Sequence, residues 1–178
     1  MIEIRWHARA GQGAKSASQL LAMAQLRAGH HVQSFPEYGP ERGGAPLRTF
    51  NRADDRPIRR RYGITEPDVV VVIEPSLERE VDVTSGLRED GLLLVNGIAP
   101  QGFGGRVEVV DAAAIADPRS ANVVMLGALA AALGDPPLED VLAAARTLFG
   151  RKLAPAALAA IEAAINGGYE AVSTEVTA

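Results

Sequence analysis

Residues 2–35 read IEIRWHARAGQGAKSASQLLAMAQLRAGHHVQSF, and this stretch decides the fold class. Apolar and polar residues alternate over Met1–His7, which is the pattern of a β-strand with one buried face. The glycine-containing turn Ala8–Gly13 follows, and Ala14–Arg27 then carries apolar residues at helical spacing up to a terminating glycine. His31–Phe35 predicts a second strand. Strand, glycine turn, helix and strand together predict a βαβ unit, the Rossmann-like start of an α/β fold.

The rest of the chain is expected to extend this sheet and to end in helices. Two extended segments, Leu47–Arg52 and Pro57–Tyr62, flank a polar turn and predict a hairpin, so the sheet should be mixed. The β-branched run Val69–Ile73 predicts a central strand covered on both faces. Further strands are expected at 91–96 and 107–110, and helices at about 76–86, 111–117, 121–134, 138–149 and 154–166. We therefore expect a three-layer α/β/α sandwich with a mostly parallel, mixed sheet and a helical last third.

Length and composition indicate one globular domain. The chain has 178 residues, of which 47% are hydrophobic and 22% are charged, an ordinary globular balance. Because no long linker is visible, residues 1–172 are expected to form a single domain, followed by a tail at 173–178. The strongly apolar run at 123–133 is too short to span a bilayer, and the N-terminus is too charged for a signal peptide. We therefore expect a cytoplasmic protein without membrane contact.

Charge and cysteine content exclude several classes of function. A formal net charge of -4 disfavours nucleic-acid binding, because affinity for phosphate backbones rests on clustered positive charge. The absence of cysteine excludes a disulfide framework, a thiolate-bound zinc, a cysteine-ligated iron–sulfur cluster and a cysteine nucleophile. None of the three histidines has a nucleophile beside it in the sequence. We expect neither a catalytic residue nor a metal site in this chain.

The turn at 8–13, ARAGQG, is the first candidate site. Backbone N–H groups at the start of a helix attract a phosphate or a carboxylate. The turn does not match the dinucleotide-binding pattern, since alanine stands at its first two glycine positions, and Ala14 before Lys15 rules out a Walker A loop. Two interpretations stay open, namely a contact for an anion or a partner and a tight connection packed on the sheet.

Two polar residues are expected together at the carboxyl ends of neighbouring strands. Glu74 and Asn96 follow two buried strands, and ligands of α/β sheets gather at the carboxyl ends of the strands. Asp68 precedes the first of these strands and belongs to the opposite end. Glu74 and Asn96 are therefore expected either to line a cleft or to cap neighbouring backbone groups.

The loop Pro36–Pro46, PEYGPERGGAP, is the second candidate site. It contains three prolines and three glycines together with an aromatic residue, two acids and an arginine. Such loops often dock onto another molecule, the alternative being a surface connection without a role. Seven arginines lie between residues 42 and 61, a local positive field that suits an anionic ligand or an acidic subunit. Because the chain has only two lysines, a general preference for arginine explains the same run.

Four motifs in order resemble those of one protein family. They are RWHARAGQGA at 5–14, FPEYGPERGGAP at 35–46, PDVVVVIEPSL at 67–77 and NVVMLGALAAALG at 122–134. They are similar to the gamma subunit of the thiamine-diphosphate-dependent 2-oxoacid:acceptor oxidoreductases, the pyruvate:ferredoxin oxidoreductase superfamily. The resemblance extends over about residues 1–170. The chain departs from the family pattern at Ala8 and Ala10, where glycine is usual, and at Gly43, where a second arginine is usual.

The resemblance implies a subunit that is inactive alone. The complex would decarboxylate a 2-oxoacid oxidatively, form an acyl-CoA and pass electrons to ferredoxin or another acceptor. Thiamine diphosphate and magnesium would belong to alpha and beta subunits, and iron–sulfur clusters to a delta-type subunit. This chain would bind no cofactor alone, but would support assembly and the approach of coenzyme A. The alternatives are a free-standing Rossmann-type nucleotide-binding protein and a purely structural subunit.

The motifs also assign residues by position. Asn122 matches an asparagine that opens a helix, and a helix N-cap role is favoured there over a catalytic one. The family's glycine turn, expected to contact the cofactor or another anion, corresponds to Arg9, Gly11, Gln12 and Gly13. The family's interface with the catalytic subunits corresponds to Tyr38, Glu41 and Arg42.

Overall fold

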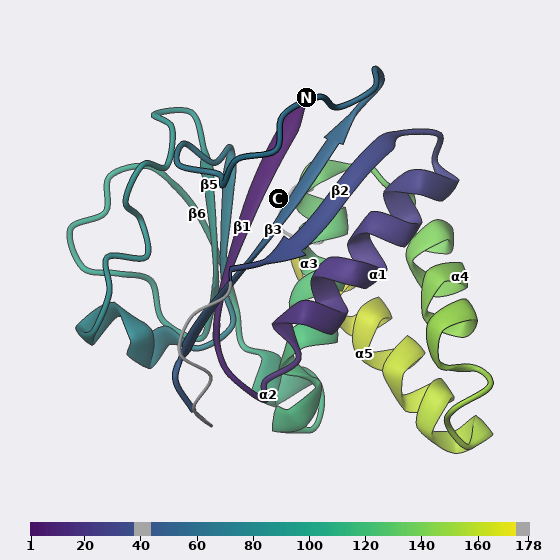
Figure 1. The fold of residues 1–178 in the computed structure, drawn as a ribbon. Coiled ribbons are helices and arrows are strands. Elements are labelled where there is room, and N and C mark those ends of the chain that lie inside the picture. The colour runs from purple at the N-terminus through teal and green to yellow at the C-terminus, as the bar shows by residue number, and fades with distance from the viewer. Residues whose placement is uncertain (38–43, 174–178) are drawn as a thin grey trace.

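A computed structural model describes residues 1–37 and 44–173 of the chain. A six-stranded sheet in the order β2-β3-β1-β4-β5-β6 runs through its centre (Figure 1). Strands β1, β4, β5 and β6 are parallel, whereas β3 runs antiparallel to both β1 and β2, so the predicted mixed sheet is confirmed. The strands are β1 (Ile2–Arg9), β2 (His31–Pro36), β3 (Pro46–Asp54), β4 (Val69–Val72), β5 (Leu92–Asn96) and β6 (Arg106–Val110).

Helices α1, α3, α4 and α5 cover one face of this sheet (Figure 1). The other face carries the short 3-10 helix η1 and irregular segments. The α/β class is confirmed, and the third layer is thinner than the expected sandwich. The helices are α1 (Ala14–Arg27), η1 (Pro75–Arg79), α2 (Ala112–Ile115), η2 (Pro118–Ser120), α3 (Ala121–Leu133), α4 (Leu138–Phe149) and α5 (Pro155–Ser173). None of the described helices has the length and hydrophobicity that crossing a bilayer requires.

The helix expected at 76–86 is replaced by the shorter η1, which ends at Arg79. The Asp82 side chain accepts hydrogen bonds from the backbone N–H and the hydroxyl of Thr84, at 3.0 and 2.8 Å. An aspartate that bonds the backbone two residues ahead favours a turn over a continuing helix. A separate turn therefore follows η1 where a longer helix was expected.

The expected hairpin between Leu47–Arg52 and Pro57–Tyr62 is wrong. Strand β3 pairs with β1 and β2, with Phe50 opposite Phe35, and residues 57–62 form no strand. The buried Arg52 side chain instead donates to the carbonyl of Tyr62 at 2.7 Å, which holds that segment over the sheet. Because β3 inserts between them, β1 and β2 are parallel without being neighbours. The opening βαβ unit therefore spans three strands.

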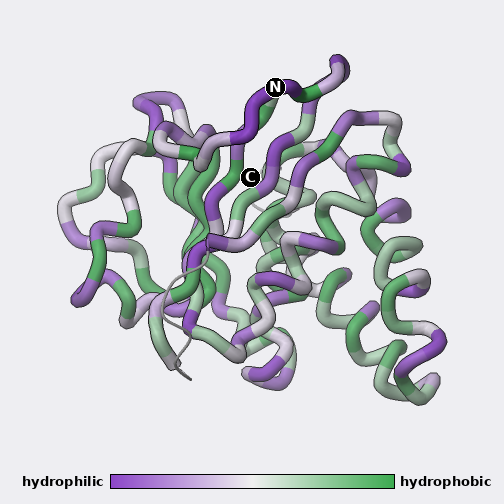
Figure 2. The backbone as a smooth tube through the Cα atoms, viewed as in Figure 1, coloured by the Kyte–Doolittle hydropathy of each residue, from purple (hydrophilic) through white to green (hydrophobic). Residues whose placement is uncertain are grey.

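The main hydrophobic core lies between the sheet and the helices. Ile4, Trp6 and Ala8 point from β1 into this core, and all three are fully buried. The Trp6 indole donates to Asn51 Oδ1 at 2.9 Å, so its polar atom is satisfied inside the core. Figure 2 shows the central strands and α3 as mainly hydrophobic. A helix that is apolar all round must be buried, and α3 lies against both the sheet and α5.

The opposite face of β1 is polar but also buried. Glu3, Arg5 and His7 are at most 5% exposed. Arg5 Nε donates to His7 Nε2 at 3.0 Å, and the same guanidinium donates to the carbonyls of Val83 and Ser85 at 3.0 and 2.6 Å. The irregular segment over this face is therefore fixed to β1 by arginine.

Burial and the neighbouring Arg5 guanidinium lower the pKa of His7 from 6.5 to about 3. The unfolded chain takes up this proton near pH 6.5, whereas the folded chain does so only near pH 3. Falling pH within this window therefore favours unfolding, by up to about 1.4 kcal/mol per pH unit. Denaturant titrations should show a weaker pH dependence for His7→Gln than for the wild type. Identical slopes in the two proteins would contradict a neutral, buried His7.

Candidate functional site

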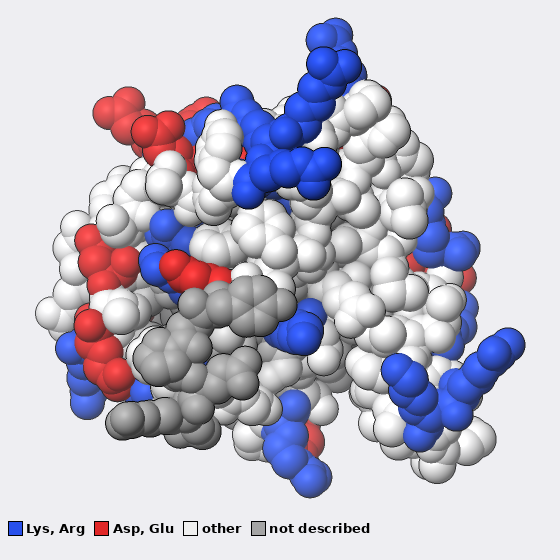
Figure 3. Space-filling view, viewed as in Figure 1, with Lys and Arg blue, Asp and Glu red and all other residues white. Residues whose placement is uncertain are grey.

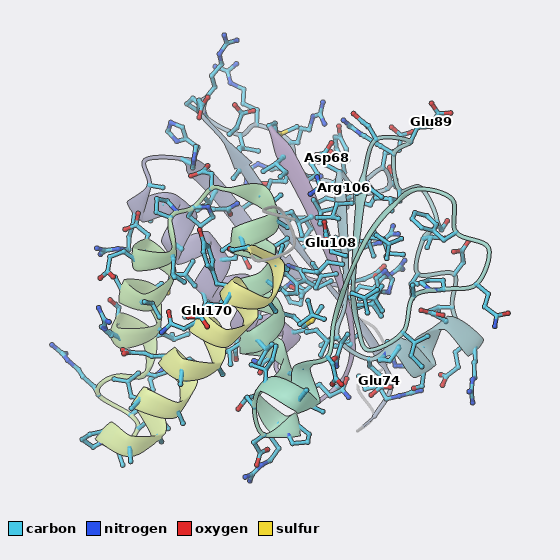
Figure 4. The ribbon with its side chains drawn as sticks, turned by 180° about the vertical axis from the view of Figure 1, so that it is seen from behind. Asp68, Glu74, Glu89, Arg106, Glu108 and Glu170 are labelled. Carbon is cyan, nitrogen blue, oxygen red and sulfur yellow. The ribbon has the colours of Figure 1, made fainter. Side chains whose placement is uncertain are left out.

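The carboxyl ends of the neighbouring parallel strands β1, β4 and β5 lie together at one end of the sheet. The turn that contains Gly11 follows β1, Glu74 follows β4, and Asn96 ends β5. Figure 4 shows Glu74 at the opposite end of the sheet from Asp68. The Asn96 amide donates to the carbonyl of Ile73 at 2.9 Å and accepts from the N–H of Ala112 at 3.1 Å. Asn96 therefore links two strand ends to α2, which is the expected capping role.

Gln12 fixes the shape of the first candidate site. Its Oε1 accepts from the backbone N–H of Arg9 at 2.7 Å, and its Nε2 donates to Glu74 Oε2 at 2.7 Å. Burial alone raises the pKa of Glu74, but hydrogen bonds from Ser76 and Gln12 outweigh it and hold that pKa below its ordinary value. An ionised carboxylate therefore orients the Gln12 amide from the end of β4.

The backbone conformation and the close approach of Asn122 require a glycine at position 13. Its φ is 77°, in the left-handed region, and a Cβ there would lie 2.5 Å from Asn122 Nδ2. The same Asn122 amide donates to the carbonyl of Gly13 at 3.1 Å. The expected N-cap role of Asn122 is wrong, since α3 begins at Ala121, Ser120 occupies the N-cap position, and Asn122 lies inside the first turn. Asn122 instead ties α3 to the glycine turn.

The Arg9 guanidinium already has partners inside the chain. It donates to Glu80 Oε1 at 2.5 Å, to Ser76 Oγ at 3.1 Å and to the carbonyl of Gly44 at 3.2 Å. The hydrogen bond between the Arg9 guanidinium and the Glu80 carboxylate raises the pKa of Arg9 and lowers the pKa of Glu80. An anion that binds Arg9 must therefore compete with a carboxylate of the protein.

The backbone of the turn fits an anion better than its side chains do. Gly11 is exposed, and a Cβ there would meet no atom within 4 Å. No side chain in the described residues caps the N-terminus of α1, and the first N–H groups of a helix have no partner within the helix itself. Lys15 is exposed in the first turn of α1 and forms no ion pair within residues 1–37 and 44–173. Within those residues, no group of three His, Asp or Glu side chains is placed to hold a metal ion.

The second candidate site begins beside the first. Tyr38, Glu41 and Arg42 lie outside the described residues. The ends of their loop are described. The carbonyl of Ala45 accepts from the N–H of Ala10 at 2.9 Å, and Glu37 forms an ion pair with Arg48. The structure therefore joins the loop at 36–46 to the glycine turn.

The arginines expected to form one positive field are divided among three places. Arg52 is fully buried, and Arg48 is paired with Glu37. Arg42 lies outside the described residues. The other four are exposed in the segment after β3, at the end of the sheet away from the glycine turn: Arg56, Arg59, Arg60 and Arg61. Arg48 and Arg52 lie on one face of β3, since they are four residues apart, whereas the strand ends at Asp54 and the later arginines follow it in solvent.

Comparison with known proteins identifies the family. The family described as pyruvate ferredoxin/flavodoxin oxidoreductase matches residues 3–167. The chain belongs to this family. The pyruvate ferredoxin/flavodoxin oxidoreductase match includes the glycine turn, Glu74, Glu80 and Asn122, so all partners of the first candidate site lie within it. The resemblance found in the four sequence motifs is therefore confirmed.

Individual members of the family match over nearly their full length. Pyruvate synthase subunit PorC of Thermotoga maritima is 48% identical, over 96% of this chain and 94% of that protein. The common gamma subunit of the pyruvate/ketoisovalerate oxidoreductases of Thermococcus kodakarensis is 43% identical, over 93% of this chain and 96% of that protein. A crystal structure of the Thermotoga maritima pyruvate oxidoreductase subunit PORC has a TM-score of 0.81 at 44% identity, covering 95% of each chain. The described fold is thus similar to that of a solved family member.

Proposed function

We propose that this chain is the gamma-type subunit of a cytoplasmic complex that decarboxylates a 2-oxoacid oxidatively and passes the electrons to ferredoxin or another acceptor. The observation that carries the proposal is the match to two relatives, one named as a pyruvate synthase subunit and the other as the common gamma subunit of pyruvate/ketoisovalerate oxidoreductases, with 94% and 96% of their lengths covered. Identity of 43–48% over whole chains supports a common place in a complex as well as a common fold.

In this proposal the redox cofactors belong to partner subunits. Thiamine diphosphate and magnesium lie in alpha and beta subunits, and the iron–sulfur clusters lie in a delta-type subunit. The cysteine content supports this division, because a chain without cysteine offers no thiolate to a cluster. The present chain completes the assembly, and its loop with Tyr38, Glu41 and Arg42 contacts the catalytic subunits.

The turn with Arg9, Gly11, Gln12 and Gly13 is proposed to receive an anionic part of coenzyme A. Free N–H groups at the start of α1 and the open space at Gly11 support this role. The Arg9–Glu80 pair adds a condition, because the guanidinium must leave Glu80 before it can bind a phosphate. The carboxylate therefore competes with the ligand for the same cation.

Two substitutions test this role in the reconstituted complex. Arg9→Ala should raise the KM for coenzyme A about tenfold, because one charge-assisted hydrogen bond is lost. Glu80→Gln should lower that KM, because Arg9 is released. Arg146→Ala is a matched control, since Arg146 is an arginine paired with Glu139 and Glu162 on the far helices.

Steady-state turnover with varied coenzyme A measures the effect, and native gel analysis verifies assembly. An unchanged KM in both Arg9→Ala and Glu80→Gln would contradict the ligand role of the turn. Full turnover by a complex that lacks this chain would instead show a purely structural subunit. Binding of NADH by the isolated chain would favour the Rossmann-type alternative.

A further inference from the structure

Strand β2 leaves one edge of the sheet open. Among the described strands it pairs with β3 alone, and Glu37 just beyond it donates its N–H to the carbonyl of Arg48 at 3.0 Å. Backbone direction alternates along a strand, so the N–H and C=O groups of Val32 and Ser34 point away from β3. Within residues 1–37 and 44–173, these outward groups form no hydrogen bond. Such an edge is a template for one more strand.

An open hollow of about 320 Å³ lies along this edge, lined by Gln33, Ser34, Phe35 and Arg61. Its aromatic side is firmly held, since the Phe35 and Phe50 rings pack with centroids 5.3 Å apart. The Gln33 amide donates to the carbonyl of Arg60 at 2.9 Å, which fixes the arginine segment beside the hollow. A side chain from an added strand therefore meets an aromatic ring and a guanidinium.

The segment that borders the hollow carries uncompensated positive charge. Arg56, Arg59 and Arg61 are exposed and form no ion pair with any residue that the structure describes. Arg60 lies 3.5 Å from Glu3, which is its carboxylate partner. Figure 3 shows basic side chains gathered at the end of the molecule where β3 ends. In a chain of net charge -4, this arginine strip, residues 56–61, is a local site for an acidic partner.

We propose that the β2 edge and the arginine strip together dock an extended, acidic segment of a partner subunit, which adds a strand beside β2. The inference rests on the proposed function, since it requires a partner. Strand addition supplies main-chain hydrogen bonds, while the hollow and the arginines select the side chains. A second copy of this chain is a poorer occupant, because its own β2, HVQSFP, would bring no acidic side chain to the arginine strip. Pro36 lacks an N–H and limits the added strand to the length of β2.

Charge reversal tests the electrostatic part in the full chain. The double variant Arg59→Glu with Arg61→Glu should weaken the Kd for the purified partner subunits at least about tenfold at low salt, and less at high salt. The matched control is Arg151→Glu with Lys152→Glu, which makes the same change of charge at exposed residues between α4 and α5. We expect the Kd of the control to stay within about twofold of the wild type.

Amide hydrogen exchange tests the strand itself in the unaltered protein. The amides of Val32 and Ser34 should exchange at least about tenfold more slowly in the assembled complex than in the free chain. An Arg61→Lys variant treated with a carbodiimide should link to Asp or Glu of the partner, and peptide mapping then identifies the acidic segment. These two readouts do not depend on the folding of the charge-reversed variant.

Equal affinity of the charge-reversed variant and the wild type would overturn the inference, as would unchanged exchange at Val32 and Ser34 on assembly. Protection of the same amides in a homodimer of this chain would overturn it as well. A wild-type chain that binds no thiamine-diphosphate subunit would contradict the proposed function. The two failures are distinguishable. If no complex forms, the proposed function is wrong, whereas a complex that forms without using the β2 edge contradicts this inference alone.

Discussion

Gly168→Ala should destabilise the chain far more than Gly167→Ala, although the two glycines are neighbours in α5. A Cβ at Gly168 would overlap the backbone carbonyl of Val124 in α3, whereas a Cβ at Gly167 would meet only Cγ2 of Ile115, at 2.6 Å. Ile115 is half-buried at the end of the short helix α2, which can shift by a small amount, but the Val124 carbonyl moves only if α3 and α5 separate. We expect Gly168→Ala to lower the free energy of unfolding by about 3 kcal/mol. Gly167→Ala should cost less than about 1 kcal/mol, since alanine favours a helix.

Denaturant titration of the isolated chain measures both values. Gly127→Ala provides a second test from the other helix, because its Cβ would overlap the carbonyl of Ile165. It should match Gly168→Ala, since both changes force the same two helices apart. Equal midpoints for Gly167→Ala and Gly168→Ala would show that this helix contact tolerates separation.

Arg52→Met should be the most damaging substitution on the other side of the sheet. Arg52 is 0% exposed and Glu3 is 5% exposed, and Arg52 Nε lies 2.6 Å from Glu3 Oε1. Removing the arginine leaves the buried carboxylate with only the more distant, exposed Arg60, at 3.5 Å, and deprives the carbonyls of Tyr62 and Gly63 of their donor. Breaking such a pair from one side costs about 3–5 kcal/mol.

The control is Arg88→Met, which removes an arginine that is 45% exposed and paired with Asp68. Exposed pairs contribute little, so this loss should stay below about 1 kcal/mol. Adding Glu3→Met to Arg52→Met should recover part of the lost stability, because the buried carboxylate that has lost its buried partner is then removed as well. An equal loss for Arg52→Met and Arg88→Met would contradict the account of the buried pair.

The sequence predicts the elements whose pattern is local. The run Val69–Ile73 and the helices at 121–134 and 138–149 lie within a few residues of their observed bounds, because burial imposes their periodicity. The sequence does not predict the pairing of β2 with β3, because the loop at 37–45 that joins them is much longer than the short turns by which a hairpin is identified. The segment 57–62 has the composition of a strand, but the buried Arg52 binds its carbonyl groups from the side. Tertiary contact thus overrides local preference there.

In the candidate site too, the local features are visible in the sequence and the tertiary contacts are not. The glycine turn is visible in the sequence because Gly11 and Gly13 stand between a strand and a helix. Its partners are not visible, since Gln12 bonds Glu74 over 62 residues and Arg9 bonds Glu80 over 71 residues. Asn122 reaches Gly13 over 109 residues. No sequence spacing marks such contacts, and only the meeting of strand ends at one edge of the sheet creates them.

Native mass spectrometry of the tagged chain, purified without oxygen from its own cells, tests whether the chain is a subunit of a 2-oxoacid oxidoreductase complex. We expect a heteromeric complex whose other chains carry thiamine diphosphate and iron–sulfur clusters. The mass of each subunit then identifies the partners and the electron-accepting chain. A lone monomer or homodimer that retains a bound nucleotide would contradict the subunit role, and the glycine turn would then be an independent ligand site.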